Sequence, residues 1–165
     1  MEIRETRTPV RDPERAAADR VRVLVVDDSP EACAAIGEVV AHVDEFVLVA
    51  SAASGDEALA LLPEHDPDLV LLDIRMKGLD GPETTRLIRA GGSRAVVVLV
   101  SALSGPELLR EAHSCGADAI IQKRDVSPRL LTFLWPSLRS RTLVARAGAL
   151  ARQRGAGFLP GSSAG

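Results

Sequence analysis

Five short apolar runs, spaced at similar intervals, constrain the fold more than any other feature of this sequence. Each run has the length of a buried strand, and a segment with helix-start signals follows each one. Strands that alternate with helices in this way form parallel βαβ units with right-handed crossovers. We therefore expect an α/β fold. The runs are Val23–Val26, Phe46–Ala50, Leu69–Leu72, Val96–Val100 and Ala119–Ile121.

Helix-start and helix-end signals lie between these runs. Ser29 and Pro30 supply an N-cap and a proline at the first helical position. Ser104 and Glu107 have the spacing of a capping box, and Gly116 is placed to end the same helix. These signals predict a helix after each strand.

Five strands with helices on both faces predict a flavodoxin-like (βα)5 doubly wound parallel sheet with strand order 2-1-3-4-5. A Rossmann dinucleotide-binding domain is the competing α/β fold, and it requires a Gly-x-Gly-x-x-Gly turn after the first strand. Here that turn is Asp27-Asp28-Ser29-Pro30. Two carboxylates would repel a pyrophosphate, so the sequence argues against a dinucleotide site.

Composition favours one soluble domain with tails. The chain has 165 residues, of which 46% are hydrophobic, and no apolar run approaches the length needed to cross a bilayer. The charged N-terminal stretch lacks the apolar region of a secretory signal, and Cys33 and Cys115 match no metal or redox spacing. We expect a cytoplasmic protein with a mobile arm at 1–20, a domain at 21–139, and an amphipathic helix and disordered tail at 140–165.

Polar residues stand at the carboxyl ends of four predicted strands. They are Asp27 and Asp28, Asp73, Ser101 and Lys123. Three carboxylates brought together require a counter-charge, and oxygen ligands with room for water suit Mg²⁺, with Lys123 supplying the remaining charge. Such a site is equipped to accept a phosphoryl group on Asp73. Ser101 would donate a hydrogen bond to the product and move the loop that follows its strand, which predicts a two-state switch.

Across about residues 21–139 the chain resembles the receiver domain of two-component response regulators. The resemblance implies that Asp73 is the phosphoacceptor and that Ser101 and Lys123 contact the phosphate. It also implies that Asp28, Asp73 and the backbone carbonyl of Arg75 bind Mg²⁺, with Asp27 acting through water. The matching residues are Val-Leu-Val-Val-Asp27-Asp28, Leu-Leu-Asp73-Ile-Arg-Met76 with Asp80-Gly81, Val-Ser101-Ala102, and Gly116-Ala117-Asp118 followed by Lys123.

The family implies a function as well as a site. A histidine kinase or phosphotransfer protein would supply the phosphoryl group, and a downstream protein would bind the switched surface. The chain would catalyse only its own phosphorylation and dephosphorylation, and would not otherwise be an enzyme. A phosphatase or transferase with an aspartate nucleophile is disfavoured, because it needs a second carboxylate where Arg75 stands.

Three departures from the family leave an alternative open. Met76 is followed by Lys77, and Lys123 by Arg124, where the family often has proline. Ile120 stands at the position of the aromatic switch residue, and an aliphatic side chain cannot swing a polar-tipped ring into a cavity. The alternative hypothesis is a phosphorylation-independent pseudo-receiver that acts as an interaction module.

The 26 residues after Arg139 are too few for a helix-turn-helix module with its own core, so we expect a single-domain response regulator. This tail could dock on its own domain, pair with a second copy to form a homodimer, or hold a partner. Direct DNA binding is not expected, because nothing supplies base readout. An apolar stripe at helical spacing comprises Leu143, Val144, Ala147, Leu150 and Ala151, and seven Arg against one Asp follow from Arg124 onward.

Overall fold

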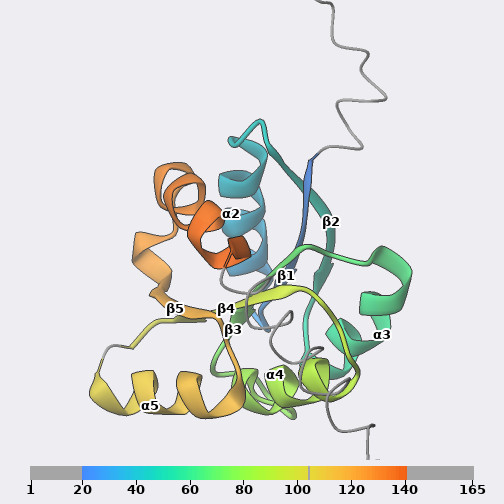
Figure 1. Ribbon diagram of the computed structural model, residues 1–165, viewed down its shortest axis with the longest axis vertical. Coiled ribbons are helices and arrows are strands. Elements are labelled where there is room, and N and C mark those ends of the chain that lie inside the picture. Colours follow the sequence, from blue (N-terminus) through green and yellow to red (C-terminus); the bar gives the residue numbers. More distant parts are fainter. Residues whose placement is uncertain (1–19, 104, 141–165) are drawn as a thin grey trace, which may run out of the picture.

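A single parallel sheet forms the centre of the computed structural model, which describes residues 20–103 and 105–140 (Figure 1). Its strand order is β2-β1-β3-β4-β5, and neighbouring strands run parallel to each other. This order confirms the predicted flavodoxin-like fold. The strands are β1 (Val21–Val26), β2 (Phe46–Ala52), β3 (Leu69–Asp73), β4 (Val96–Ser101) and β5 (Ala119–Gln122).

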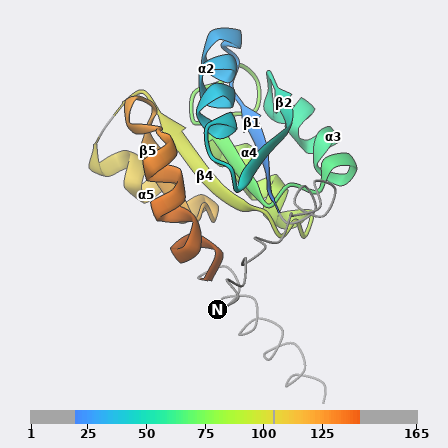
Figure 2. The same ribbon diagram turned by 90° about the horizontal axis from the view of Figure 1, so that it is seen from above.

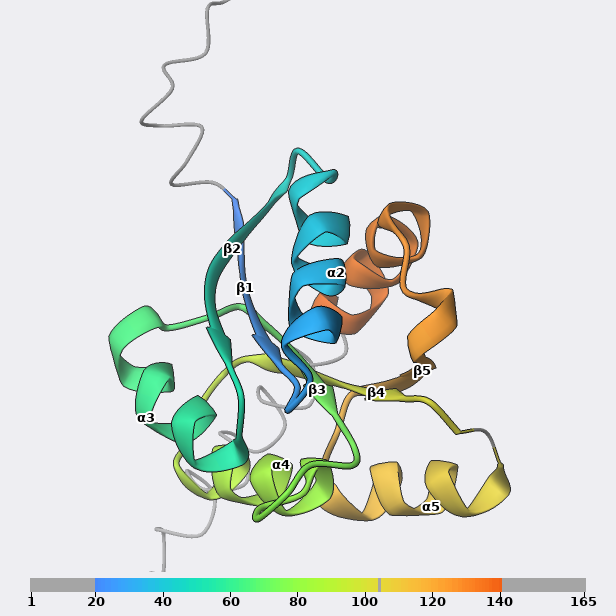
Figure 3. The ribbon, with the colours of Figure 1, turned by 180° about the vertical axis from the view of Figure 1, so that it is seen from behind.

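Helices cover both faces of the sheet. Helix α2 and the helix at 128–140 lie on one face, and α3, α4 and α5 lie on the other (Figure 1). The views from above and from behind show the same division (Figures 2 and 3). The helices are α2 (Pro30–Ala41), α3 (Gly55–His65), α4 (Gly81–Ala90) and α5 (Pro106–Cys115), and a 3-10 turn, η1 (Lys123–Asp125), follows β5.

The central strand β3 is buried on both faces. Successive side chains of a strand point to opposite sides of the sheet. Leu69 and Leu71 accordingly pack in the apolar layer under α2, and Val70 and Leu72 pack in the layer under α3, α4 and α5. Asp73 is the last residue of this fully buried strand and therefore lies at the edge of the core.

Several helix boundaries follow their sequence signals. The Ser29 hydroxyl accepts a hydrogen bond from the Ala32 amide at 3.2 Å, and Pro30 is the first residue of α2. Gly116 ends α5 with φ of +86°, a left-handed conformation that favours glycine. These predicted boundaries are confirmed.

The predicted capping box at Ser104 and Glu107 is wrong. Helix α5 begins at Pro106 with Gly105 as its N-cap, and a glycine has no side chain with which to cap. A capping box does occur at the start of α4, where the Asp80 carboxylate accepts from the Glu83 amide at 2.8 Å. Spacing alone cannot choose the cap, because the backbone conformation at the cap decides which serine or aspartate can reach the amide.

The predicted arm at 1–20 and tail at 140–165 lie outside the described residues, except at their innermost positions. The domain boundaries therefore stay a prediction. Within the described residues, no helix has the length and apolar character needed to cross a membrane.

Candidate functional site

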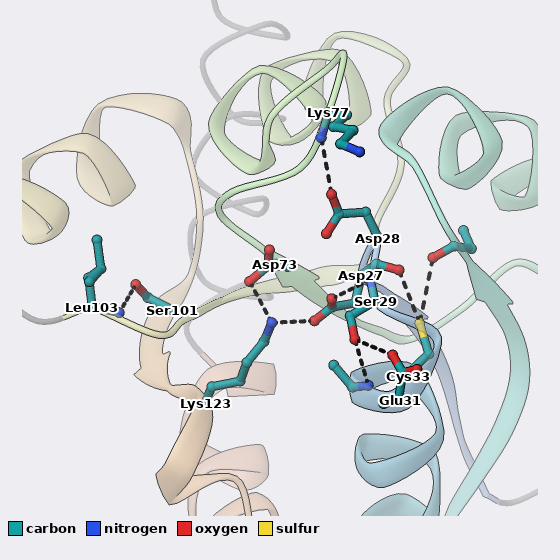
Figure 4. A network of polar contacts seen from close by, with 12 residues as sticks. Asp27, Asp28, Ser29, Glu31, Cys33, Asp73, Lys77, Ser101, Leu103 and Lys123 are labelled. Carbon is teal, nitrogen blue, oxygen red and sulfur yellow. Dashed lines mark hydrogen bonds and ion pairs between the residues drawn. The ribbon is translucent and has the colours of Figure 1, made fainter.

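Three carboxylates gather where β1 and β3 end. The two strands are neighbours, and Val26 of β1 is in register with Leu72 of β3, so Asp27 and Asp73 leave the sheet side by side. Asp28 follows directly. One carboxylate oxygen from each of these three residues lies within 4.8 Å of the other two. The predicted convergence of the acidic residues is therefore found in the fold (Figure 4).

Lys123 joins the two buried carboxylates. Its Nζ lies 2.6 Å from Oδ2 of Asp27 and 3.1 Å from Oδ1 of Asp73 (Figure 4). Asp27 is 1% exposed and Asp73 is 5% exposed, so both charges lie in a setting where water screens them little. Lys123 directly follows β5, so its ammonium lies at the same edge of the sheet as Asp27 and Asp73.

Backbone amides orient the two β1 carboxylates. The Ser29 N–H donates to Oδ1 of Asp27 at 3.0 Å, within the turn that starts α2. The Lys77 N–H donates to Oδ2 of Asp28 at 3.4 Å from the loop after β3. Sequence reasoning treated Lys77 only as a departure from the family, because a main-chain contact leaves no signature in residue type.

The pKa of Asp73 is raised above its ordinary value of 3.8. Burial of the carboxyl is the main cause and the negative charge of Asp27 adds to it, while Lys123 and the Arg75 backbone oppose the shift. Burial lowers the pKa of Lys123, but its hydrogen bonds and charge interactions with Asp27 and Asp73 outweigh that effect and raise the pKa. The ammonium therefore stays charged.

The donor set fits a divalent cation. Three carboxyl groups and one ammonium give this end of the sheet more acidic than basic groups. One oxygen from each carboxylate lies within 4.8 Å of the other two, so Asp27, Asp28 and Asp73 would hold a Mg²⁺ ion, which prefers oxygen ligands. Oδ2 of Asp27 is buried and lacks a hydrogen-bond donor other than its ion-pair partner Lys123.

Ser101 reaches the same edge but points elsewhere. It is buried at the end of β4, beside Val100, which is in register with Asp73. Its hydroxyl accepts a hydrogen bond from the Leu103 amide at 3.0 Å and is turned away from Asp73 (Figure 4). Its predicted phosphate contact therefore stays a prediction, and it would require the hydroxyl to leave Leu103.

Arg75 and Ile120 are the other two positions that the family resemblance singled out. Arg75 is exposed in the loop after β3, and its role as a metal ligand through the backbone carbonyl stays a prediction. Ile120 is half-buried in β5 and packs against the apolar layer under α3, α4 and α5. That packing agrees with an aliphatic core role at this position.

Gly81 has a steric role that sequence reasoning did not identify. A Cβ atom at this position would lie 2.5 Å from the carbonyl oxygen of Asp73 and 2.9 Å from Cα of Ile74. The Gly81 amide also donates to the Ile74 carbonyl at 3.0 Å. A residue without a side chain thus lets the start of α4 press against the backbone that carries Asp73.

The fold and the charged edge define a signalling receiver, and comparison with known proteins agrees. The family model described as "Response regulator receiver domain" matches residues 23–134. The chain belongs to the response regulator receiver family.

Individual relatives support the assignment. A nitrate/nitrite response regulator homolog of Haemophilus influenzae is 32% identical over 68% of this chain and 54% of its own length. The chain thus spans about half of this relative. The solved receiver domain of the NarL regulator from Mycobacterium tuberculosis is 28% identical, with a TM-score of 0.63 over 79% of this chain and 98% of that one.

A third similar structure is that of a CheX–CheY–BeF3–Mg²⁺ complex from Borrelia burgdorferi. It is 28% identical, with a TM-score of 0.60 over 68% of this chain and 88% of that one.

Proposed function

We propose that this chain is a phosphorylation-controlled switch in which Asp73 accepts a phosphoryl group with Mg²⁺ as cofactor. The observation that carries the proposal is the buried carboxylate of Asp73, 3.1 Å from Lys123 Nζ and grouped with Asp27 and Asp28. The BeF3 and Mg²⁺ named for the related Borrelia complex support a site for a phosphoryl-like group and a metal.

The chain's own residues account for most of the chemistry. An oxygen of Asp73 attacks phosphorus, a P–O bond forms, and the bond to the leaving imidazole or carboxylate breaks with its electron pair. The Lys123 ammonium then donates a hydrogen bond to a phosphoryl oxygen in place of Oδ1 of Asp73, and its ion pair with Asp27 remains. Bound Mg²⁺ would neutralise charge on the transferring group, held by Asp28, Asp73 and the Arg75 carbonyl, with Asp27 acting through water.

The switch would act through Ser101. A phosphoryl group on Asp73 offers a charged acceptor to the Ser101 hydroxyl, and charge-assisted hydrogen bonds are stronger than neutral ones. Moving the hydroxyl breaks its bond with the Leu103 amide and frees the start of the loop that follows β4. The changed surface would then bind a downstream protein.

The phosphodonor we propose is the phosphohistidine of a histidine kinase or a phosphotransfer protein. The direct test is phosphotransfer profiling of the wild type and Asp73→Asn against the histidine kinases of the host. One kinase should label the wild type rapidly and leave Asp73→Asn unlabelled. Equal labelling of both proteins would refute the assignment of Asp73.

A second candidate, the pseudo-receiver, is favoured by Ile120. It replaces the aromatic residue expected there and packs as an ordinary core side chain. Under this hypothesis the chain binds its partner without phosphorylation. Partner affinity that is the same for wild type and Asp73→Asn, together with no Mg²⁺ binding by titration, would favour it.

A further inference from the structure

A groove with a volume of about 1420 Å³ lies along one side of the domain. Its lining comes from three separate segments, which are residues 42–45, parts of 120–125, and most of 127–134. None of the three site carboxylates lines this groove. The groove is therefore a second surface, which adjoins the charged edge because its lining residues Gln122 and Arg124 flank Lys123.

An exposed aromatic ring marks the wall of this groove. The Phe133 side chain is 77% exposed, more than the other exposed large hydrophobic side chains of the described residues. Leu130, Leu134, Ile121 and the buried Val43 line the same groove. A ring left in water beside other apolar side chains is typical of a surface that another apolar segment covers.

Two acidic residues, Asp44 and Glu45, are exposed and line the groove. The next residue, Phe46, packs its ring edge-on against Trp135, with ring centroids 6.1 Å apart. This acidic pair therefore lies beside the helix at 128–140. The two arginines that line the groove belong to its other two segments.

The segment that follows this helix has matching chemistry. Residues 141–154 contain four arginines and no acidic residue, and an apolar stripe recurs at helical spacing between Leu143 and Ala151. Phe133 and Ser140 are seven residues apart, about 10 Å along a helix, and a helix over 143–151 would span about 14 Å. A segment that turns back after Ser140 can therefore reach Phe133.

We propose that residues 141–154 occupy this groove in the same molecule. The apolar stripe would cover Phe133, and the arginines would face Asp44 and Glu45. The short connection gives the segment a high effective concentration at the groove, so modest contacts are enough for docking. A second copy of the chain is the competing occupant, and it makes a different prediction on dilution.

Limited trypsin digestion of the full chain tests the proposal, because the segment carries its own cleavage sites. Cleavage after Arg146 and Arg152 is followed by mass spectrometry in wild type, Phe133→Ser and Leu109→Ser. Leu109 is a matched control, since it is 53% exposed and does not line the groove. Docking predicts cleavage at least about fivefold slower in wild type and in Leu109→Ser than in Phe133→Ser, because a docked site must open before it is cut.

The same experiment has two outcomes that overturn the proposal. Cleavage as fast in wild type as in Phe133→Ser would mean that the segment does not cover the groove. Protection that disappears on dilution would assign the groove to a second copy. The double variant Asp44→Asn/Glu45→Gln tests the charge contribution independently, and docking as proposed predicts faster cleavage in this variant too. Thermal unfolding of each variant verifies that it is folded.

Discussion

The hydroxyl of Ser101 accepts a hydrogen bond from the backbone amide of Leu103 at 3.0 Å. This bond holds the first residues after β4 in one arrangement, with the Leu103 side chain 58% exposed. Ser101 is also the proposed hydrogen-bond donor to a phosphoryl group on Asp73, and turning its hydroxyl toward that group would break the bond with the Leu103 amide. In the proposed function, this rearrangement would change the exposed loop after β4 without an aromatic switch residue.

We predict that Ser101→Ala uncouples Leu103 from phosphorylation. In wild type, adding Mg²⁺ and beryllofluoride, a phosphoryl mimic, should shift the Leu103 amide resonance in NMR spectra. In Ser101→Ala the amide should resonate at a different position from the start and respond at most weakly. Ser101→Thr keeps the hydroxyl and should behave as wild type. An undiminished response in Ser101→Ala would contradict the account.

The raised pKa of Asp73 gives a pH-dependent prediction for the metal-free protein. The folded state binds this proton more tightly than the unfolded state, so the stability that the group contributes is complete below the ordinary value of 3.8. That stability is lost as the pH rises through the folded-state pKa. In denaturant unfolding with EDTA, the stability of Asp73→Asn relative to wild type should therefore increase as the pH rises above about 4. A wild type that gains stability relative to Asp73→Asn as the pH rises would contradict the account.

Mg²⁺ should stabilise the wild type through its carboxylates. At a metal concentration of about 100 times the dissociation constant, binding to the folded state alone contributes about 2.7 kcal/mol, which raises the unfolding temperature by several degrees. Asp28→Asn should lose most of this increase, because it removes one of the three grouped carboxylates. Glu38→Gln, an exposed acid on α2, is the matched control and should keep it. An equal rise in unfolding temperature in all three proteins would mean that Mg²⁺ binds elsewhere.

Because Gly81 lies so close to the Asp73 backbone, we predict that even an alanine side chain at this position destabilises the fold. Gly81→Ala forces a Cβ to within 2.5 Å of the Asp73 carbonyl, so the backbone must shift, at a cost of about 1–3 kcal/mol of unfolding free energy. The shift should also weaken Mg²⁺ binding. Gly91→Ala is the control, since its Cβ would meet its nearest neighbour at 3.4 Å. Equal stability of the two variants would refute the steric argument.

Much of the fold and the acidic site could be predicted from the sequence. The apolar runs are short and uncharged, and helix-start signals separate them, so the order of strands and helices follows from local patterns. The positions of Asp27, Asp73 and Lys123 then follow from topology, because parallel strands end at one edge of the sheet. The ion pairs of Lys123 with Asp27 and Asp73 agree with that expectation.

Contacts that depend on backbone geometry could not be predicted. The amide of Lys77 near Asp28 and the close approach of Gly81 to Asp73 depend on how one loop folds over another. The same holds for Arg89, which bonds to the carbonyls of Gly116 and Ala95 and pairs with Asp118 at 2.6 Å. The direction of the Ser101 hydroxyl is set by a neighbouring amide, and residue type does not reveal it.

The most direct test of the central claim is the intact mass of the protein after incubation with acetyl phosphate. Wild type with Mg²⁺ should gain the mass of one phosphoryl group, and the gain should disappear when EDTA replaces Mg²⁺ or when Asp73 is changed to Asn. A single added phosphoryl group that persists in Asp73→Asn, or that forms equally without a divalent cation, would contradict the account.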